Sequence, residues 1–134
     1  MGERQWVYVG NNSGKGPSPL EKAAVAAACE RFIEDVLKPR FLPEIRVTEF
    51  NYPIDIGGKW HGRNFRFYQR YRSNGIHTKE GEFESPFVRL EYSSHDRFNI
   101  SFFRHTGKWW RLYRSVSLSK ALRLVEEDGL LHPL

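Results

Sequence analysis

Hydrophobic and polar residues alternate along residues 64–72, and this period of two predicts a β-strand with two different faces. Apolar rings lie on one side of the strand, whereas arginines and one tyrosine lie on the other. The first side consists of Phe65, Phe67 and Tyr71, and the second consists of Arg66, Tyr68, Arg70 and Arg72. The segment is therefore expected to be a central strand with a core-facing side and a basic, partly aromatic side.

A helix is predicted ahead of this strand, because apolar residues recur there with helical spacing. The apolar stripe consists of Val25, Cys29, Phe32 and Val36, widened by Ile33 and Leu37. Residues 18–21, Ser-Pro-Leu-Glu, supply an N-cap, a proline for the first turn and the glutamate of a capping box. Pro39 predicts that the helix ends near residue 37 or 38.

A second helix is predicted near the C-terminus. Ser117 is its expected N-cap, and Gly129 is expected just after its last turn. One face of this helix carries Leu118, Ala121, Leu122 and Val125. Residues 130–134 are apolar enough to pack back on the domain.

The residues between the two helices predict further strands. Ile45 to Tyr52 form the first, and Pro53 breaks this strand or places it at a sheet edge. Gly57 and Gly58 offer a two-residue hairpin turn into residues 64–72. After a polar connection over residues 73–84, whose acidic end can pair with a nearby arginine, three strands follow with short turns between them.

The last of these three strands covers residues 109–113. Strict alternation there places Trp110 and Leu112 opposite Trp109, Arg111 and Tyr113. The whole order predicts an α+β fold: a four- to five-stranded antiparallel meander with an N-terminal and a C-terminal helix packed on one face.

At 134 residues the chain fits one domain. Residues 18–134 are expected to form it, and residues 1–17 are expected to be a flexible N-terminal arm, within which residues 6–9 form either a short strand or part of the arm. No apolar run approaches the roughly 18 residues that cross a bilayer, and no secretory leader is recognisable. A cytoplasmic protein that binds no membrane is therefore expected.

Basic and aromatic residues gather in one part of the chain. Residues 59–115 hold 12 Lys or Arg residues against 5 Asp or Glu, together with 14 of the 20 aromatic residues. This combination is typical of a surface that binds nucleic acid or an acidic partner. Arginine outnumbers lysine 14 to 7 in the chain, and genomic composition alone would produce that ratio.

Catalytic and metal chemistry have little support. Cys29 is the only cysteine and lies in the apolar stripe, so a buried structural thiol is expected, with no disulfide and no zinc site. The five histidines have no metal-ligand spacing, and no cofactor is predicted. His105 beside Arg104, and then His61, are the candidates for a general acid in RNA cleavage, but no motif defines their geometry and no catalytic residue is assigned.

The leading helix, the Pro43-Glu-Ile-Arg46 segment and the Trp109-to-Tyr113 strand resemble those of small bacterial proteins classed as domains of unknown function. The similarity spans about residues 25–115. The resemblance implies a compact prokaryotic domain and carries over no catalytic residues.

Two binding functions follow from the basic and aromatic face. It can hold nucleic acid, single-stranded or RNA, because rings stack on bases and cations follow phosphates. Alternatively, it is a protein-interaction surface, including that of a homodimer, because Arg, Trp and Tyr dominate protein interfaces. An RNA-cleaving enzyme is the third hypothesis. The expected binding residues are Arg66, Tyr68, Arg70, Arg72, Trp109, Arg111 and Tyr113, with Trp110 and Arg114 as the alternative to the last three. Arg66, Arg70 and Arg72 could instead pair with Glu82, Glu84 or Glu91 on neighbouring strands.

Overall fold

Five antiparallel strands form a single sheet, and their order across the sheet is their order along the chain. The structure is a computed structural model that describes residues 15–73 and 81–133. The strands are β1 (Asn51–His61), β2 (Asn64–Ser73), β3 (Glu82–Ser94), β4 (Arg97–Phe103) and β5 (Trp109–Val116). The predicted antiparallel meander is confirmed, with five strands. Residues 1–14 of the predicted N-terminal arm lie outside the described residues.

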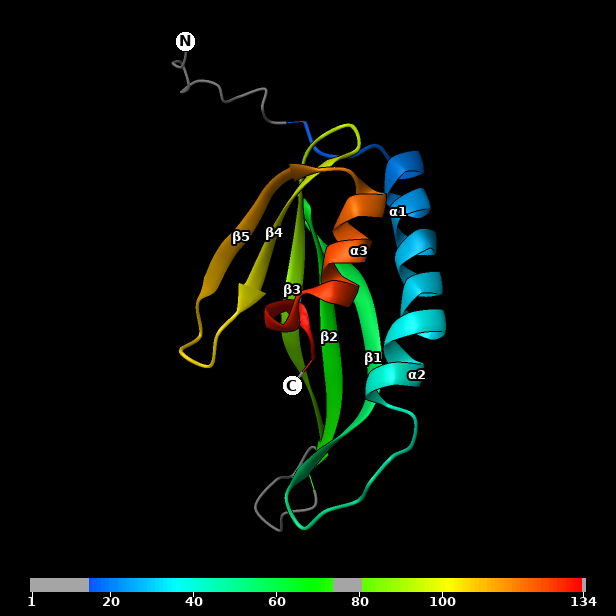
Figure 1. Ribbon diagram of the computed structural model, residues 1–134, viewed down its shortest axis with the longest axis vertical. Helices are drawn as coiled ribbons and strands as arrows, with labels where there is room; N and C mark the ends of the chain where they lie inside the picture. The colour runs from blue at the N-terminus through cyan, green and yellow to red at the C-terminus, as the bar shows by residue number, and fades with distance from the viewer. Residues whose placement is uncertain (1–14, 74–80, 134) are drawn as a thin grey trace.

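Helical segments precede and follow the sheet. Before β1 come α1 (Pro19–Phe32), the π-helical turn η1 (Ile33–Leu37) and α2 (Lys38–Phe41). After β5 come α3 (Leu118–Glu127) and the 3-10 turn η2 (Gly129–Leu131). α1 and α3 lie over the same face of the sheet, as Figure 1 shows. The predicted α+β class is therefore confirmed. No helix of the described residues is long and apolar enough to span a membrane.

The core lies between the sheet and these helices. The strands contribute fully buried side chains such as Phe65, Phe67 and Leu90, and the helices contribute Cys29 and Val125. Burial of each large apolar side chain stabilises the fold by about 1.5–3 kcal/mol. The core-facing side that alternation predicts for β2 is confirmed, as is the buried thiol of Cys29.

The start of α1 also agrees with its prediction. The Ser18 hydroxyl accepts a hydrogen bond from the Glu21 N–H at 3.1 Å, and the Glu21 carboxylate accepts one from the Ser18 N–H at 2.9 Å. This capping box satisfies two otherwise unpaired backbone donors. Farther along α1, the indole N–H of Trp60 donates to the Lys22 carbonyl at 3.1 Å and joins the helix to β1.

The predicted end of the first helix is wrong. The helix runs through Pro39 and ends at Phe41, because η1 precedes the proline. In this wider turn the Lys38 N–H donates to the Ile33 carbonyl, five residues back. A proline ring normally collides with the carbonyl of the preceding turn. The π-helical turn shifts that register by one residue, and the helix continues through Pro39.

The predicted strand at Ile45 to Tyr52 is also wrong, because β1 begins at Asn51. Asn51 pairs with Ser73, the last residue of β2, so β2 offers no partner to residues 42–50. Ile45 and Val47 are consequently exposed. Pro53 lies in an edge strand, beside a register shift, where its missing N–H costs no ladder hydrogen bond.

The turn expected at Gly57 and Gly58 lies farther on, at Gly62, whose φ is +58°. Gly57 and Gly58 are instead inside β1, where neighbouring rings lie against the backbone. A Cβ on Gly58 would approach the Phe65 ring to 2.5 Å, and one on Gly57 would approach the Tyr68 hydroxyl to 2.6 Å. These glycines therefore serve close packing and do not reverse the chain.

The C-terminal helix agrees with its prediction. The Ser117 hydroxyl caps α3 by accepting a hydrogen bond from the Lys120 N–H at 3.2 Å, and Gly129 follows the end of the helix. Leu131 is fully buried, so the end of the chain does pack back on the domain.

Candidate functional site

The face of the sheet opposite the helices carries a row of basic residues. Lys59 pairs with Arg66, Arg66 with Arg89, Arg89 with Ser101, and Ser101 with Arg111. The row therefore crosses all five strands, and with about 4.8 Å between strands it is roughly 19 Å long. Lys59, Arg66, Arg89 and Arg111 are called the basic row below.

The two ends of the basic row form ion pairs. Lys59 Nζ lies 2.6 Å from the carboxylate of Glu84, and an Arg111 nitrogen lies 3.4 Å from that of Glu91. Nearby on β2, Arg70 and Arg72 also pair, with Glu84 at 3.8 Å and Glu82 at 3.0 Å respectively. The pairing of arginines with the acidic end of the 73–84 connection is thus confirmed. Such exposed pairs contribute at most about 1 kcal/mol each.

The centre of the basic row is different. Arg66 and Arg89 lie directly opposite each other on β2 and β3, and neither forms an ion pair with a carboxylate of the described residues. Their Nε atoms are buried and have no hydrogen-bond partner in the described part of the chain. Burial lowers the pKa of Arg89, and the charges of Arg66 and Arg111 act in the same direction, while Glu91 opposes them.

The indole of Trp109 lies against both central arginines. The guanidinium carbon of Arg66 is 5.7 Å from its centroid and that of Arg89 is 4.9 Å away. Each contact of this kind contributes about 0.5–1 kcal/mol at a partly exposed site. Phe103 packs edge-on against the same indole, with 5.0 Å between ring centroids. Arg66, Arg89 and Trp109 form a cluster, here called the arginine–tryptophan cluster, in which two positive charges share one aromatic ring.

Six of the seven predicted binding residues lie on this face. Arg66, Arg70 and Arg72 follow from the alternation of β2, and Trp109 and Arg111 follow from the register with β4. Tyr68 lies over Gly57, and its ring is 5.1 Å from Lys59 Nζ. Tyr68 therefore packs against the edge strand β1, beside the arginine–tryptophan cluster.

The seventh predicted residue, Tyr113, is not on this face. Ser101 pairs with Arg111 and Ile100 with Tyr113, so Leu112 is an extra residue in β5. A bulge of this kind reverses the facing of the residues that follow it. Tyr113 consequently packs against the core beneath the helices, and its hydroxyl donates to the Asp128 carboxylate at 2.6 Å. The prediction that Tyr113 shares a face with Trp109 and Arg111 is wrong.

A family model described as a domain of unknown function (DUF3024) matches residues 17–133, nearly the whole of the described chain. The chain belongs to the DUF3024 family. The resemblance to an uncharacterised domain family is thereby confirmed. No curated protein and no solved structure matches this DUF3024 chain.

Sequence reasoning missed two members of the basic row in this DUF3024 domain, Lys59 and Arg89. The alternation of β3 puts Arg89 on the face away from Val88 and Leu90, and this pattern could have predicted which face Arg89 occupies. Its position beside Arg66 depends on the register of β2 with β3. The long connection between these two strands does not specify that register, and a further shift lies between Phe67 and Tyr68.

The candidate catalytic residues of this DUF3024 domain are not gathered into one site. Arg104 and His105 follow the end of β4 and line a cavity on the helix side of the sheet. His61 pairs with Asn64 at the β1–β2 turn, in line with Glu91 and Asn99, near the other end of the sheet. Among the described residues, no three His, Cys, Asp or Glu side chains are grouped as metal ligands.

Proposed function

We propose that the chain is a binding domain that holds single-stranded nucleic acid on the helix-free face of its sheet. The observation that carries this proposal is the arginine–tryptophan cluster. Its two guanidinium groups are adjacent, form no ion pair with a carboxylate of the described residues, and lie against an aromatic ring.

The phosphate groups of the nucleic acid supply what the central arginines lack. A guanidinium is a planar fork of donors that matches the oxygens of a phosphate. Two of them side by side carry an unsatisfied charge, and their buried Nε atoms are donors without an acceptor. The Nε atoms themselves are shielded from solvent, so a phosphate would contact the outer guanidinium nitrogens of these two partly exposed side chains.

The aromatic residues on this face suit the bases. A base that stacks on an aromatic side chain contributes about 1–3 kcal/mol, and Trp109 and Tyr68 are partly exposed beside the basic row. Stacking of this kind requires an unpaired base. The described residues place no helix on this face that would enter a major groove. A single strand is therefore a better ligand than a duplex.

The ion pairs around the cluster limit the site but are compatible with it. Arg70, Arg72, Lys59 and Arg111 already have carboxylate partners. Each exposed pair is weak enough for a phosphate to compete with it. The tightest phosphate contacts are therefore expected at Arg66 and Arg89, with weaker ones at the ends of the basic row.

Fluorescence anisotropy with labelled oligo(dT) and oligo(U) tests this function. Binding is expected to weaken as salt rises, and Arg66→Gln and Arg89→Gln are each expected to reduce affinity at least tenfold and to lower the salt slope by about 1. Arg31→Gln on α1 removes the same charge from the helix side of the domain and is the matched control. Salt-independent binding, or unchanged affinity in both cluster variants, would contradict the proposal.

A protein-interaction module is the second candidate, and one observation favours it on a different surface. Ile45, Val47 and Phe50, in the connection between α2 and β1, are 53%, 68% and 72% exposed. Large apolar side chains gathered in one exposed segment are typical of contact sites. Light scattering tests whether two copies associate. A second copy held through this segment would separate when Val47→Asp and Phe50→Asp are introduced, whereas a monomer at all concentrations excludes the homodimer.

A further inference from the structure

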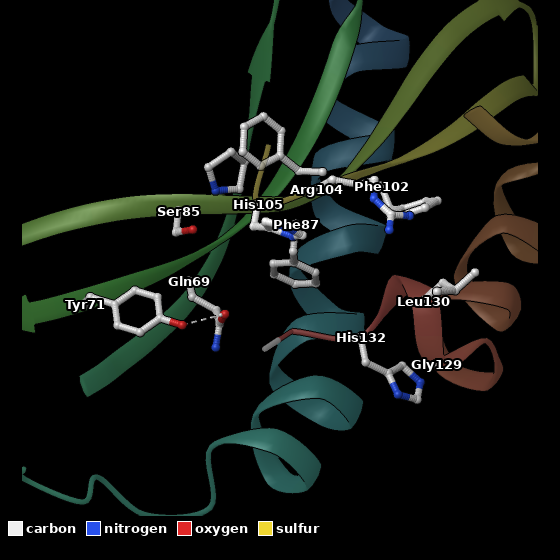
Figure 2. A pocket seen from close by; sticks show the side chains of 12 residues that line it. Gln69, Tyr71, Ser85, Phe87, Phe102, Arg104, His105, Gly129, Leu130 and His132 are labelled. Carbon is white, nitrogen blue, oxygen red and sulfur yellow. Dashed lines mark hydrogen bonds between the residues drawn. The ribbon is translucent and has the colours of Figure 1, made fainter. Parts of the chain in front are cut away.

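A cavity of about 490 Å³ lies where β4 ends and the C-terminal turn meets the sheet. β4 pairs with β3 only as far as Val88, so the first part of β3 continues past the end of β4 without that neighbour. Figure 2 shows Tyr71 and Gln69 reaching into the space from β2, with Leu130 and His132 at its other side. A volume in this range accommodates a small molecule of one or two rings.

Apolar rings and a small polar group line the cavity. Phe87 and Phe102 supply aromatic surface. Gln69 is a buried polar side chain on the otherwise apolar side of β2, only 5% exposed, and accepts a hydrogen bond from the Tyr71 hydroxyl at 3.1 Å. Sites for small ligands typically combine mostly apolar walls with a few fixed polar groups of this kind.

The basic side chains that line the cavity have no acidic partner among the other lining residues. Arg104, His105 and His132 line it, and no Asp or Glu is among its described lining residues. The guanidinium of Arg104 lies over the Phe102 ring, 5.7 Å from the centroid, and forms no ion pair with a carboxylate of the described chain. An arginine held over an aromatic wall without a carboxylate is suited to an anion attached to a flat apolar body.

We propose that this cavity binds a small aromatic molecule that carries an oxyanion, either a carboxylate or a phosphate. Its ring occupies the space between Phe87, Phe102 and Leu130. Its anionic group pairs with Arg104 at the mouth of the cavity, where His105 adds a further donor. The Gln69 and Tyr71 side chains provide polar contacts at the inner end.

This site is separate from the face proposed for nucleic acid. The cavity is on the helix side of the sheet, and the arginine–tryptophan cluster is on the other. Among the residues that the structure describes, Phe103 alone belongs to both surroundings, since it lines the cavity and packs on Trp109. A protein that lacks one of these two binding activities can therefore still have the other.

Titration of the whole chain with three naphthalene probes at pH 7, followed by amide chemical shifts, tests the proposal. The probes are 2-naphthoate, 2-naphthyl phosphate and the neutral 2-naphthalenemethanol. At least one anion is expected to bind tenfold or more tightly than the alcohol and to shift the amides of Gln69, Tyr71 and Leu130. The preferred anion distinguishes a carboxylate ligand from a phosphate ligand.

Substitutions then test the role of charge. Arg104→Gln is expected to weaken binding of the preferred anion at least tenfold, whereas Arg31→Gln leaves it unchanged. Leu130 is 56% exposed and tolerates polar replacement, so Leu130→Glu is expected to weaken the anion more than the uncharged Leu130→Gln does. Equal binding of all three probes, anion affinity that survives Arg104→Gln, or shifts confined to the Trp109 face would each overturn the proposal.

Discussion

The hydroxyl of Tyr113 donates a hydrogen bond of 2.6 Å to the carboxylate of Asp128 and thereby joins β5 to the end of α3. α3 begins only two residues after β5 ends, so this short connection holds the start of the helix near the strand and the hydrogen bond holds its end. Asp128 also accepts a hydrogen bond from the Leu130 N–H and starts the last turn of the chain. One residue pair thus orients the whole C-terminal segment.

Tyr113→Phe is expected to lower the free energy of unfolding by about 1 kcal/mol, less than the roughly 1.5–3 kcal/mol of a hydrogen bond to a charged group, because the pair is partly exposed. Urea denaturation at pH 7 measures the change. Asp128→Asn keeps an acceptor and serves as the comparison, and the double variant should lose less than the sum of the two single losses. Additive losses would mean that the two side chains do not interact.

The same pair predicts a loss of stability in alkali. The hydrogen bond to Asp128, together with burial, raises the pKa of Tyr113 above its usual 10.0. The folded state therefore holds this proton more tightly than the unfolded state. The stabilisation from this tighter proton binding is complete below pH 10 and declines as pH rises through the raised pKa of Tyr113. Tyr113→Phe should reduce the decline in unfolding free energy measured above pH 10.

Acid is expected to act through Glu21. Hydrogen bonds from the Ser18 backbone, His95 and Tyr92 lower the pKa of Glu21 to about 2, from 4.5. As pH falls, the unfolded state therefore binds a proton at this carboxylate before the folded state does. The stabilisation that the ionised Glu21 provides is complete above pH 4.5 and is lost as pH falls toward 2. Urea denaturation at a series of pH values should show a shallower acid slope for Glu21→Gln. Glu30→Gln on the same helix is the matched control, and equal slopes for both variants would contradict the assignment.

Gly58 has no space for a side chain. Its Cβ would meet the Phe65 ring at 2.5 Å and an Ile33 methyl at 3.3 Å, and both of these side chains are buried. Gly58→Ala is expected to destabilise the fold by about 1–3 kcal/mol through overpacking. Gly129→Ala is the control, since no heavy atom lies within 4 Å of the added carbon. Equal midpoints of thermal unfolding for the two variants would show that the side chains around Gly58 move to make room for the added carbon.

Cys29 should be inert to thiol reagents in the native state. The side chain is fully buried, and burial raises its pKa to about 12, with the nearby Glu30 charge adding to the effect. The reactive thiolate is therefore almost absent at pH 8. Labelling with iodoacetamide is expected only as urea unfolds the chain. Because Cys29 is the only cysteine, rapid labelling without urea would place it at the surface.

The arginine–tryptophan cluster is expected to cost stability in the free protein. Arg89→Met removes a buried, unsatisfied Nε, which is worth about 1–3 kcal/mol, and loses a cation–π contact worth about 0.5–1 kcal/mol. The larger effect is the first, so the variant should be more stable than the parent and bind oligonucleotide less well. Arg70→Met, which breaks an exposed ion pair with Glu84, is the comparison. A destabilised Arg89→Met would show that Arg89 stabilises the fold and would contradict this prediction.

Much of the architecture follows from local patterns. Alternation assigns the two faces of β2 correctly, and a capping box and an apolar stripe locate α1, because these signals depend on residues close together in the chain. The errors arise where distant groups decide. The Gly57–Gly58 pair has the composition of a turn, but the rings of Tyr68 and Phe65 require glycine there inside a strand. Pro39 would normally end a helix, but the π-helical turn η1 before it lets the helix continue.

The candidate site follows the same division. The four predicted residues on β2 come from period two alone, whereas the side taken by Trp109 and Arg111 depends on the pairing of β5 with β4. Tyr113 was misplaced because a single extra residue in β5 reverses the facing beyond it, and nothing in residues 109–113 distinguishes a bulge from regular alternation. The adjacency of Arg66 and Arg89 depends on pairing across a connection of several residues. Which arginines keep a free charge is decided by the positions of Glu82, Glu84 and Glu91 in space.

The meander order of the strands has a consequence for how the chain folds. Each strand pairs only with its neighbours in the sequence, so every hairpin closes a short loop at small entropic cost. α1 is the exception, because Glu21 must reach Tyr92, which is 71 residues away in the chain. Formation of the sheet can therefore precede the docking of α1, and until that docking the rings of Phe65 and Phe67 remain open to solvent.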